Sequence, residues 1–209
     1  SYALSIIDKL DTLAGFYLIN EKPTSSKDPF ALRRAAIGLL RTIIENNLVV
    51  KLRDLIDYST KAYLDQGVKQ LNNEVGKDLL IFFRERMKNI LREKKVRTDI
   101  IEASISSHFN DNFLELYKKT LIMNKFISKD LGKNAVSTYK RASNILQQEK
   151  SISKNGPDAV LFKYEEEKEL FERINSIRKT FTLKDEKKNY ESHLRLLSDT
   201  KLSTDKFFD

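Results

Sequence analysis

The chain has 209 residues, of which 33% are charged and 40% are apolar, and its formal net charge is +8. This composition predicts a soluble globular protein that can hold one large or two small domains. The chain contains no cysteine, which excludes disulfides, a thiolate nucleophile and a cysteine-based zinc site. It has no apolar run of about 18 residues, so we expect no transmembrane helix and no membrane partner. The start lacks both Met and the basic region of a signal peptide, so we expect a fragment or a processed piece of a longer protein. The lack of cysteine is compatible with the expected cytoplasmic location.

Charge is distributed unevenly along the chain. Residues 76–150 contain 16 Lys and Arg against 9 Asp and Glu, whereas the segments before and after are nearly balanced. A localised basic excess is the electrostatic footprint expected for a polyanion partner such as nucleic acid. The alternative is a basic helix face that is simply solvated.

The chain is predicted to be helical throughout. Only 6 glycines and 3 prolines occur, and apolar residues recur at helical spacing without long strand-like alternation. The first expected helix covers about 2–19. Its inward positions are expected to be Leu4, Ile7, Leu10, Leu13 and Ala14.

The second expected helix begins at Asp28 and ends near Asn47. Asp28 is predicted to be the N-cap, because its carboxylate can accept hydrogen bonds from unpaired N–H groups of the first turn. Pro29 would then occupy the first helical position, where no N–H is needed. A third helix is expected over about 51–65, with Gly67 just after its end.

The polar segment 67–76 is weakly patterned, and the charge character changes there, so we place a domain boundary in it. Later helices are expected over about 77–95 and 98–106, from Asn110 or Asp111 to Phe126, from a break at Gly132 to Gln148, from Asp158 onward, and over 185–198. The segment Ser203–Asp205 is typical of an N-cap. Because few residues follow it, we expect a chain that is truncated near its C-terminus.

Motifs of the common catalytic chemistries are missing from the sequence. It has no glycine-rich nucleotide-binding loop and no HExxH zinc motif. The two histidines, His108 and His193, each lack a following Asp and a nearby second histidine. We therefore interpret them as structural or exposed. The acidic run 165–167 is interpreted as a solvated helix face rather than an acid–base pair.

Two N-terminal segments carry a family resemblance. Asp8–Leu13 and Lys27–Ala36 resemble segments of the β subunit of bacterial tetrameric glycyl-tRNA synthetase. The first segment is also similar to the last helix of HD-type metal hydrolases, where an Asp at the position of Asp8 ligates metal. The histidine ligands of that motif are absent here, so we disfavour a residual phosphohydrolase activity. We interpret Asp8 and Asp11 as polar residues with structural roles.

Further matches to the same family follow in order along the chain, at Phe82–Arg86, Arg97–Ile101, Tyr139–Leu146 and Asp205–Asp209. The third of these resembles a stretch of the family's helical anticodon-binding domain. On a helix, Lys140 and Asn144 are i,i+4 neighbours, and Arg141 lies beside them. The residues expected to face inward are Ala142, Ile145 and Leu146.

These residue types suit RNA recognition, because cations neutralise phosphate and an amide can hydrogen-bond a base edge. The alternative is that Arg141 and Asn144 satisfy the ends of neighbouring helices. Tyr139 is a candidate stacking group, and the basic helix over 77–95 supplies further cations. The RNA-binding candidates are Lys140, Arg141, Asn144, Arg84, Arg86, Lys88 and Tyr139.

The resemblance implies an all-α helical bundle similar to the DALR-like anticodon-binding domain of arginyl- and cysteinyl-tRNA synthetases. Residues 1–70 would be the end of an HD-like body region, and residues 75–209 the anticodon-binding bundle. The family joins glycine to tRNA-Gly with ATP and magnesium, and a separate α subunit of the heterotetramer carries the adenylate chemistry. This fragment would hold the anticodon arm and would have no catalytic, cofactor or metal-binding residues. The alternative is a helical subunit-assembly module without direct RNA contact.

Overall fold

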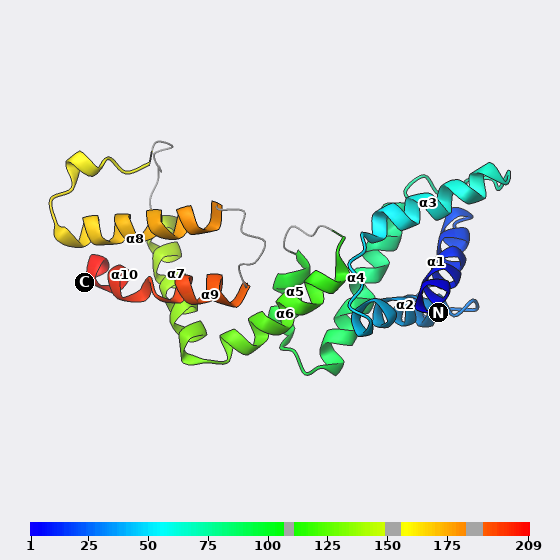
Figure 1. Cartoon of the computed structure of the whole chain (residues 1–209), viewed down its shortest axis with the longest axis horizontal. Coiled ribbons are helices and arrows are strands. Elements are labelled where there is room, and N and C mark those ends of the chain that lie inside the picture. Colours follow the sequence, from blue (N-terminus) through cyan, green and yellow to red (C-terminus); the bar gives the residue numbers. More distant parts are fainter. Residues whose placement is uncertain (107–110, 149–155, 183–189) are drawn as a thin grey trace. The chain divides into compact units, whose positions relative to one another are not determined.

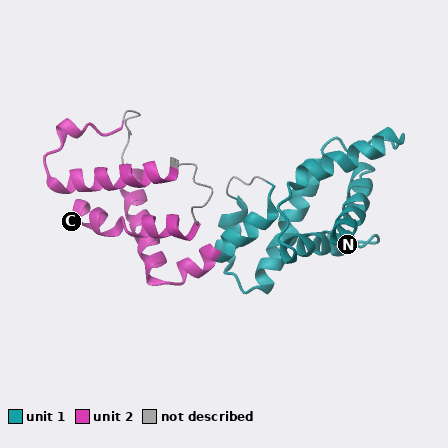
Figure 2. Ribbon diagram, in the orientation of Figure 1, with its two compact units in different colours: residues 1–121 teal, residues 122–209 magenta. Residues whose placement is uncertain are grey.

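The computed structural model describes residues 1–106, 111–148, 156–182 and 190–209, and every regular element in these ranges is a helix. The expected all-α fold class is therefore confirmed. Figure 1 shows the helices in chain order. Figure 2 shows the two compact units, which we call unit 1 (Ser1–Leu121) and unit 2 (Ile122–Asp209).

Most helices begin and end close to the expected positions. Unit 1 contains α1 (Tyr2–Leu18), α2 (Leu32–Glu45), α3 (Leu52–Asp65), α4 (Val75–Glu93), α5 (Thr98–Ser106) and the first part of α6 (Phe113–Ile127). Unit 2 continues with the rest of α6, then α7 (Asp130–Gln148), the short 3-10 helix η1 (Ala159–Leu161), α8 (Glu165–Thr182), α9 (Tyr190–Ser198) and α10 (Lys201–Phe208). The larger differences lie at the starts of α2 and α8 and at the C-terminus.

Helix α4 is the centre of unit 1, where it contacts α1, α2, α3 and α5. Its apolar residues recur four apart, and Leu79, Phe83 and Met87 are fully buried. The Phe83 ring also meets the edge of Phe113 from α6, with the ring centroids 5.9 Å apart. Burying one such side chain contributes about 1.5–3 kcal/mol, so this stripe joins α4 firmly to the first three helices.

The division into units does not coincide with the boundary expected between residues 70 and 75. The first unit extends to Leu121, because α4 packs its buried face on α1, α2 and α3. The two units are defined by which helices pack together, and this need not follow the domain boundaries of a protein family. The assignment of 1–70 and 75–209 to two family domains stays a prediction.

The start of α2 confirms one expectation and corrects another. The Asp28 carboxylate accepts hydrogen bonds from the backbone N–H of Leu32 (2.8 Å) and of Arg33 (3.1 Å), as expected. The N-cap position itself is occupied by Ala31 rather than by Asp28. The helix nevertheless begins at Leu32, and Ala31 before it has a left-handed backbone with φ 54°. A turn closed by the N–H of Ala31 donating to the Asp28 carbonyl brings the carboxylate over the first helical turn. Pro29 therefore lies in this turn, and its expected place inside the helix is wrong.

Gly132 lies inside the first turn of α7, so the break expected there is wrong. It is buried, and a Cβ at this position would collide with the backbone of Phe126 and Ile127. The missing side chain lets the start of α7 approach the end of α6 closely. Glycine is required here for space rather than for a turn.

Helix α8 begins at Glu165, several residues after the expected start at Asp158. Asp158 instead accepts from the N–H of Val160 and caps η1. The Glu167 carboxylate accepts from the N–H groups of Lys163 (2.6 Å) and Tyr164 (2.9 Å), and these bonds lower the pKa of Glu167. The capping therefore comes from within α8, in the manner of a capping box.

Helix α10 corrects the expectation of an N-cap at Ser203–Asp205. These residues lie within the helix, which begins at Lys201, and Ser203 and Thr204 are buried. The Ser203 hydroxyl donates to Glu169 of α8 over 3.2 Å. The small polar side chains therefore allow α10 to pack against α8 and α7.

Candidate nucleic-acid interface

Helix α7 exposes part of the expected RNA-binding set. Tyr139, Lys140 and Asn144 are all exposed, and the Tyr139 side chain is 72% accessible. Because successive helical residues are rotated by about 100°, Lys140 and Asn144 lie close together around the axis and one turn apart along it. One side of α7 therefore offers a cation and an amide to a partner, and Tyr139 offers an aromatic ring about 100° away from Lys140 around the axis.

Arg141 lies beside Lys140 and Asn144 around the helix, but its side chain extends to α10. Its guanidinium donates to Asp209 at 2.8 Å and to Asp205 at 3.4 Å, and it lies 5.4 Å from the centroid of the Phe208 ring. The hydrogen bond to Asp209 raises the pKa of Arg141, whereas partial burial lowers it. The net effect, with the charges of Asp209 and Asp205, is a raised pKa. This arrangement matches the alternative in which Arg141 satisfies a neighbouring helix end.

The inward face expected for this part of α7 is only partly found. Ala142 is half-buried, but Ile145 and Leu146 are exposed. Within unit 2, α7 contacts α9 and α10. The local spacing therefore identified an apolar side of the helix but not where along the helix that side is covered.

The structure separates the three candidate cations of α4. Arg84 and Lys88 are four residues apart and share a face, whereas Arg86 lies on the opposite side of the helix. Lys88 donates to Glu102 of α5 at 2.9 Å and pairs with Glu85 at 3.0 Å, and these partners raise the pKa of Lys88. Arg86 lies over the Phe82 ring, 4.8 Å from its centroid. Lys88 is thus paired with carboxylates and Arg86 is stacked on an aromatic ring. Because Arg86 also lies on the opposite side of the helix, the three cations do not form one basic patch.

Asp11 has the structural role expected of it. Its carboxylate accepts from the hydroxyls of Ser59 (3.3 Å) and Tyr63 (2.9 Å), which joins α1 to α3. Burial, followed by this hydrogen bond, raises the pKa of Tyr63 to about 12. Asp8 is exposed.

The two histidines have different outcomes. The imidazole of His193 meets the edge of the Phe181 ring with centroids 4.8 Å apart, a packing role between α9 and α8. His108 lies outside the described residues.

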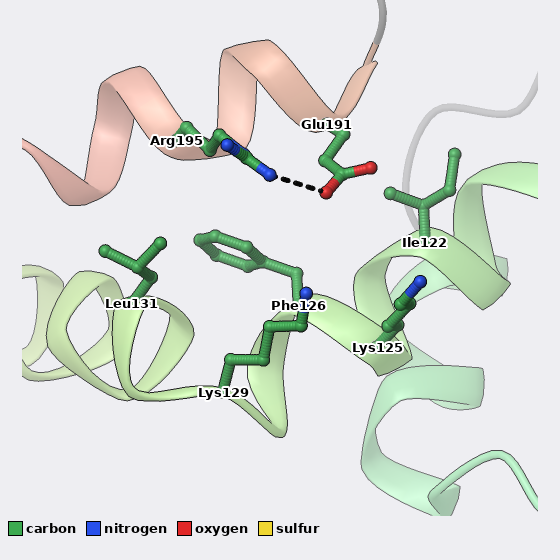
Figure 3. Close-up of a pocket in the computed structure, with 7 residues that line it drawn as sticks. All are labelled: Ile122, Lys125, Phe126, Lys129, Leu131, Glu191 and Arg195. Atoms are coloured by element: carbon green, nitrogen blue, oxygen red, sulfur yellow. Dashed lines mark hydrogen bonds and ion pairs between the residues drawn. The ribbon is translucent and has the colours of Figure 1, made fainter.

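Unit 2 also contains a small pocket that no local sequence pattern indicates. It has a volume of about 120 Å³ and lies between the end of α6, the start of α7 and α9. Figure 3 shows Glu191 and Arg195 reaching from α9 toward Phe126, with Lys125 and Lys129 on the α6 side. Its lining residues are Ile122, Lys125, Phe126, Lys129, Leu131, Glu191 and Arg195. The four-residue spacing of Lys125 and Lys129 is visible in the sequence. No sequence pattern near these lysines indicates that Glu191 and Arg195 of α9 lie beside them.

A larger hollow in unit 1 is almost entirely apolar. It has a volume of about 430 Å³ and is formed by α1, α3 and the segment between α2 and α3. Tyr58 and Val49 at its edge are each 78% exposed. Ile7, which was expected to face inward, is exposed here, as is Leu4 on the same helix. The expected inward positions Leu10, Leu13 and Ala14 are buried.

Comparison with known proteins identifies the family. A model of the glycyl-tRNA synthetase beta subunit family matches residues 1–106. The chain belongs to the glycyl-tRNA synthetase beta subunit family. A glycine–tRNA ligase beta subunit of Rhodospirillum centenum is 36% identical over 99% of this chain, and one of Ruegeria sp. is 41% identical over 71% of it. A third, from Dinoroseobacter shibae, is 31% identical and covers the whole chain.

The chain spans between a fifth and a third of the length of these three relatives, namely 20%, 29% and 33%. The family match ends at Ser106 and so contains α1 to α5. The alignments with the relatives from Rhodospirillum centenum and Dinoroseobacter shibae extend over both units. These two alignments therefore include unit 2.

Neither metal-binding clusters nor membrane-spanning helices are found in the part of the chain that the structure describes. No group of three or more His, Asp or Glu residues in these ranges is arranged to hold a metal ion. No described helix is both long and apolar enough to cross a bilayer.

Proposed function

We propose that this chain is the tRNA-contacting part of a glycyl-tRNA synthetase β subunit, and that α7 forms its contact surface. The observation that carries the proposal is the exposed set of Tyr139, Lys140 and Asn144 on one helix. Lysine supplies salt-dependent affinity for phosphate, whereas an exposed aromatic ring can stack on an unpaired base and an amide can bond its edge. The charge-paired Arg141 is given the role of holding α10 against α7.

For the whole protein, we propose the activity that the family resemblance implies. The parent enzyme would ligate glycine to tRNA-Gly with ATP and magnesium, in the cytoplasm. It would do so as a heterotetramer in which a separate α subunit forms the adenylate. The residues of this chain would contribute by binding and orienting the anticodon arm.

The proposal is tested by titrating the chain with a tRNA-Gly transcript at several salt concentrations. Lys140→Ala should weaken binding and reduce the magnitude of the slope of log affinity against log salt by about 0.7, because one phosphate contact with an unpaired strand is lost. Tyr139→Ala should weaken binding with little change in that slope. Lys163→Ala, which removes an exposed lysine of unit 2 outside α7, is the matched control.

Arg84, Arg86 and Lys88 are retained in the proposal as secondary contacts from unit 1. A tRNA with an altered anticodon separates recognition of the anticodon arm from general attraction to RNA. If tRNA-Gly does not bind at physiological salt, the proposed function is wrong. If it binds equally well to the Lys140→Ala and Lys163→Ala variants, the assignment to α7 is wrong.

A second candidate function, protein assembly, is favoured by the apolar hollow of unit 1. Exposed apolar surfaces of this kind mark protein contacts more often than RNA contacts. The relatives are several times longer than this chain, so the family supplies much further polypeptide. We propose that another segment of the same β polypeptide covers the hollow.

This second candidate makes its own prediction. Tyr58→Ser and Val49→Ser should destabilise the full-length β subunit but leave the melting temperature of this chain unchanged, because both side chains are exposed in it. Asn46→Ser, an exposed residue at the end of α2 that does not line the hollow, is the control. Equal melting temperatures for the full-length variants and wild type would exclude a covering segment.

A further inference from the structure

We infer that the pocket between α6, α7 and α9 binds a single unstacked nucleotide of RNA, with its base in the pocket and its phosphates at the lysine rim. This inference rests on the proposed function, because it requires that the chain contacts tRNA. It adds a second contact on unit 2 that is separate from the exposed face of α7.

The floor of the pocket suits a flat, partly apolar ring. Ile122, Phe126 and Leu131 form it, and Phe126 is only 6% exposed, so its position is set by the surrounding packing. Gly132 contributes indirectly, since the close approach that it permits brings Leu131 of α7 beside Phe126 of α6. The volume of about 120 Å³ admits one ring system rather than a peptide or a duplex groove.

The α9 side of the pocket supplies a planar cation. Arg195 donates to Glu191 over 3.2 Å, and Figure 3 shows this pair facing Phe126 across the pocket. A guanidinium group held in this way can stack on a base, as arginine does in single-stranded RNA recognition. The base would then lie between the apolar floor and Arg195.

The rim supplies positive charge for the phosphates. Lys125 and Lys129 are both exposed, and neither forms an ion pair with another residue in the described ranges. The lining carries three cations and one carboxylate, so its net charge is positive even with Arg195 paired. Two ammonium groups beside an apolar slot match the two parts of a nucleotide, a charged backbone and a ring with little charge.

The experiment uses this chain and a short single-stranded RNA, with tRNA-Gly as the second probe. The double variant Lys125→Ala/Lys129→Ala should lower the affinity for both about tenfold or more and reduce the magnitude of the salt slope by about 1.4, because two phosphate contacts are lost. Leu131→Ser should weaken binding without changing the salt slope. Circular dichroism melting of each variant shows whether unit 2 has kept its fold.

The control, Lys163→Ala/Lys168→Ala, removes two exposed lysines of the same unit outside the pocket and should have the smaller effect. RNA that carries a photoreactive base should crosslink to the peptide containing Phe126. Loss of binding by the pocket variant alone, with this crosslink, supports the inference.

Three results would overturn parts of this scheme, and they are distinguishable. If wild type binds no RNA, the proposed function fails together with the inference. If wild type binds but the pocket and control variants bind equally, only the pocket assignment fails. If a poly-glutamate peptide displaces the RNA at equal charge concentration, the pocket is a general anion site and the nucleotide assignment is wrong.

Discussion

The Arg141 guanidinium donates to the Asp209 carboxylate over 2.8 Å, and this contact joins the middle of α7 to the residue that follows α10. Asp205 accepts from the same group, and Asp205 also pairs with Lys201 of its own helix. Arg141 therefore belongs to a small charge network within unit 2. We therefore assign Arg141 to the docking of α10 against α7 rather than to RNA binding.

Replacing Arg141 should loosen α10. Arg141→Ala is expected to lower the melting temperature of the chain at low salt and to speed hydrogen exchange at Ser203 and Thr204 in α10. Both effects should shrink as salt is added, because exposed ion pairs are screened. Lys133→Ala breaks an ion pair with Asp130 inside α7 and should leave exchange in α10 unchanged. Equal exchange in the two variants would contradict the docking role.

Removing the Asp28 carboxylate should destabilise the start of α2. Asp28→Ala leaves the N–H groups of Leu32 and Arg33 without their acceptor, at an expected cost of about 1 kcal/mol in the free energy of unfolding. Asp28→Asn keeps one acceptor oxygen and should lose less. Chemical denaturation of the three proteins gives the comparison, and an alanine variant as stable as wild type would exclude the capping role.

The two glycines of unit 2 offer a test of close packing. Gly132→Ala should destabilise unit 2 by about 1–3 kcal/mol, because the added methyl group meets backbone atoms of α6 that cannot move aside. Gly156→Ala is the matched control, since no atom lies within 4 Å of the added Cβ there. Thermal unfolding followed by circular dichroism should separate the two variants, and equal melting temperatures would refute the requirement for glycine at 132.

Stability at alkaline pH should depend on Tyr63. Its pKa is raised from 10.0 to about 12 in the folded chain, so folded Tyr63 keeps a proton that the unfolded chain loses. The folded state binds more protons in this interval, and the free energy of unfolding must therefore fall as pH rises from 10 to 12. Tyr63→Phe should make this fall less steep. The test is to measure the free energy of unfolding of both proteins between pH 9 and 12. Parallel pH profiles would show that the Tyr63 contact to Asp11 does not contribute.

Much of the helical architecture follows from local sequence. Helix formation depends on the spacing of apolar residues and on capping groups within a few residues, which is why α1, α3, α4 and α5 begin and end near the expected positions. The capping role of Asp28 was predictable for the same reason. The family resemblance was also carried by contiguous segments, such as Lys27–Ala36, and needs no tertiary structure.

The tertiary structure alone decided which side chains meet. Arg141 finds its partners 64 and 68 residues away, and the pocket joins Phe126 to Arg195 across a similar distance in sequence. Ile145 and Ile7 have helical spacing that suggests burial, yet both are exposed because no other helix of the described chain covers them fully. Sequence spacing determines which face of a helix is apolar. The packing of helices that are distant in sequence determines which part of that face is buried, and which cations are paired with carboxylates rather than exposed to a partner.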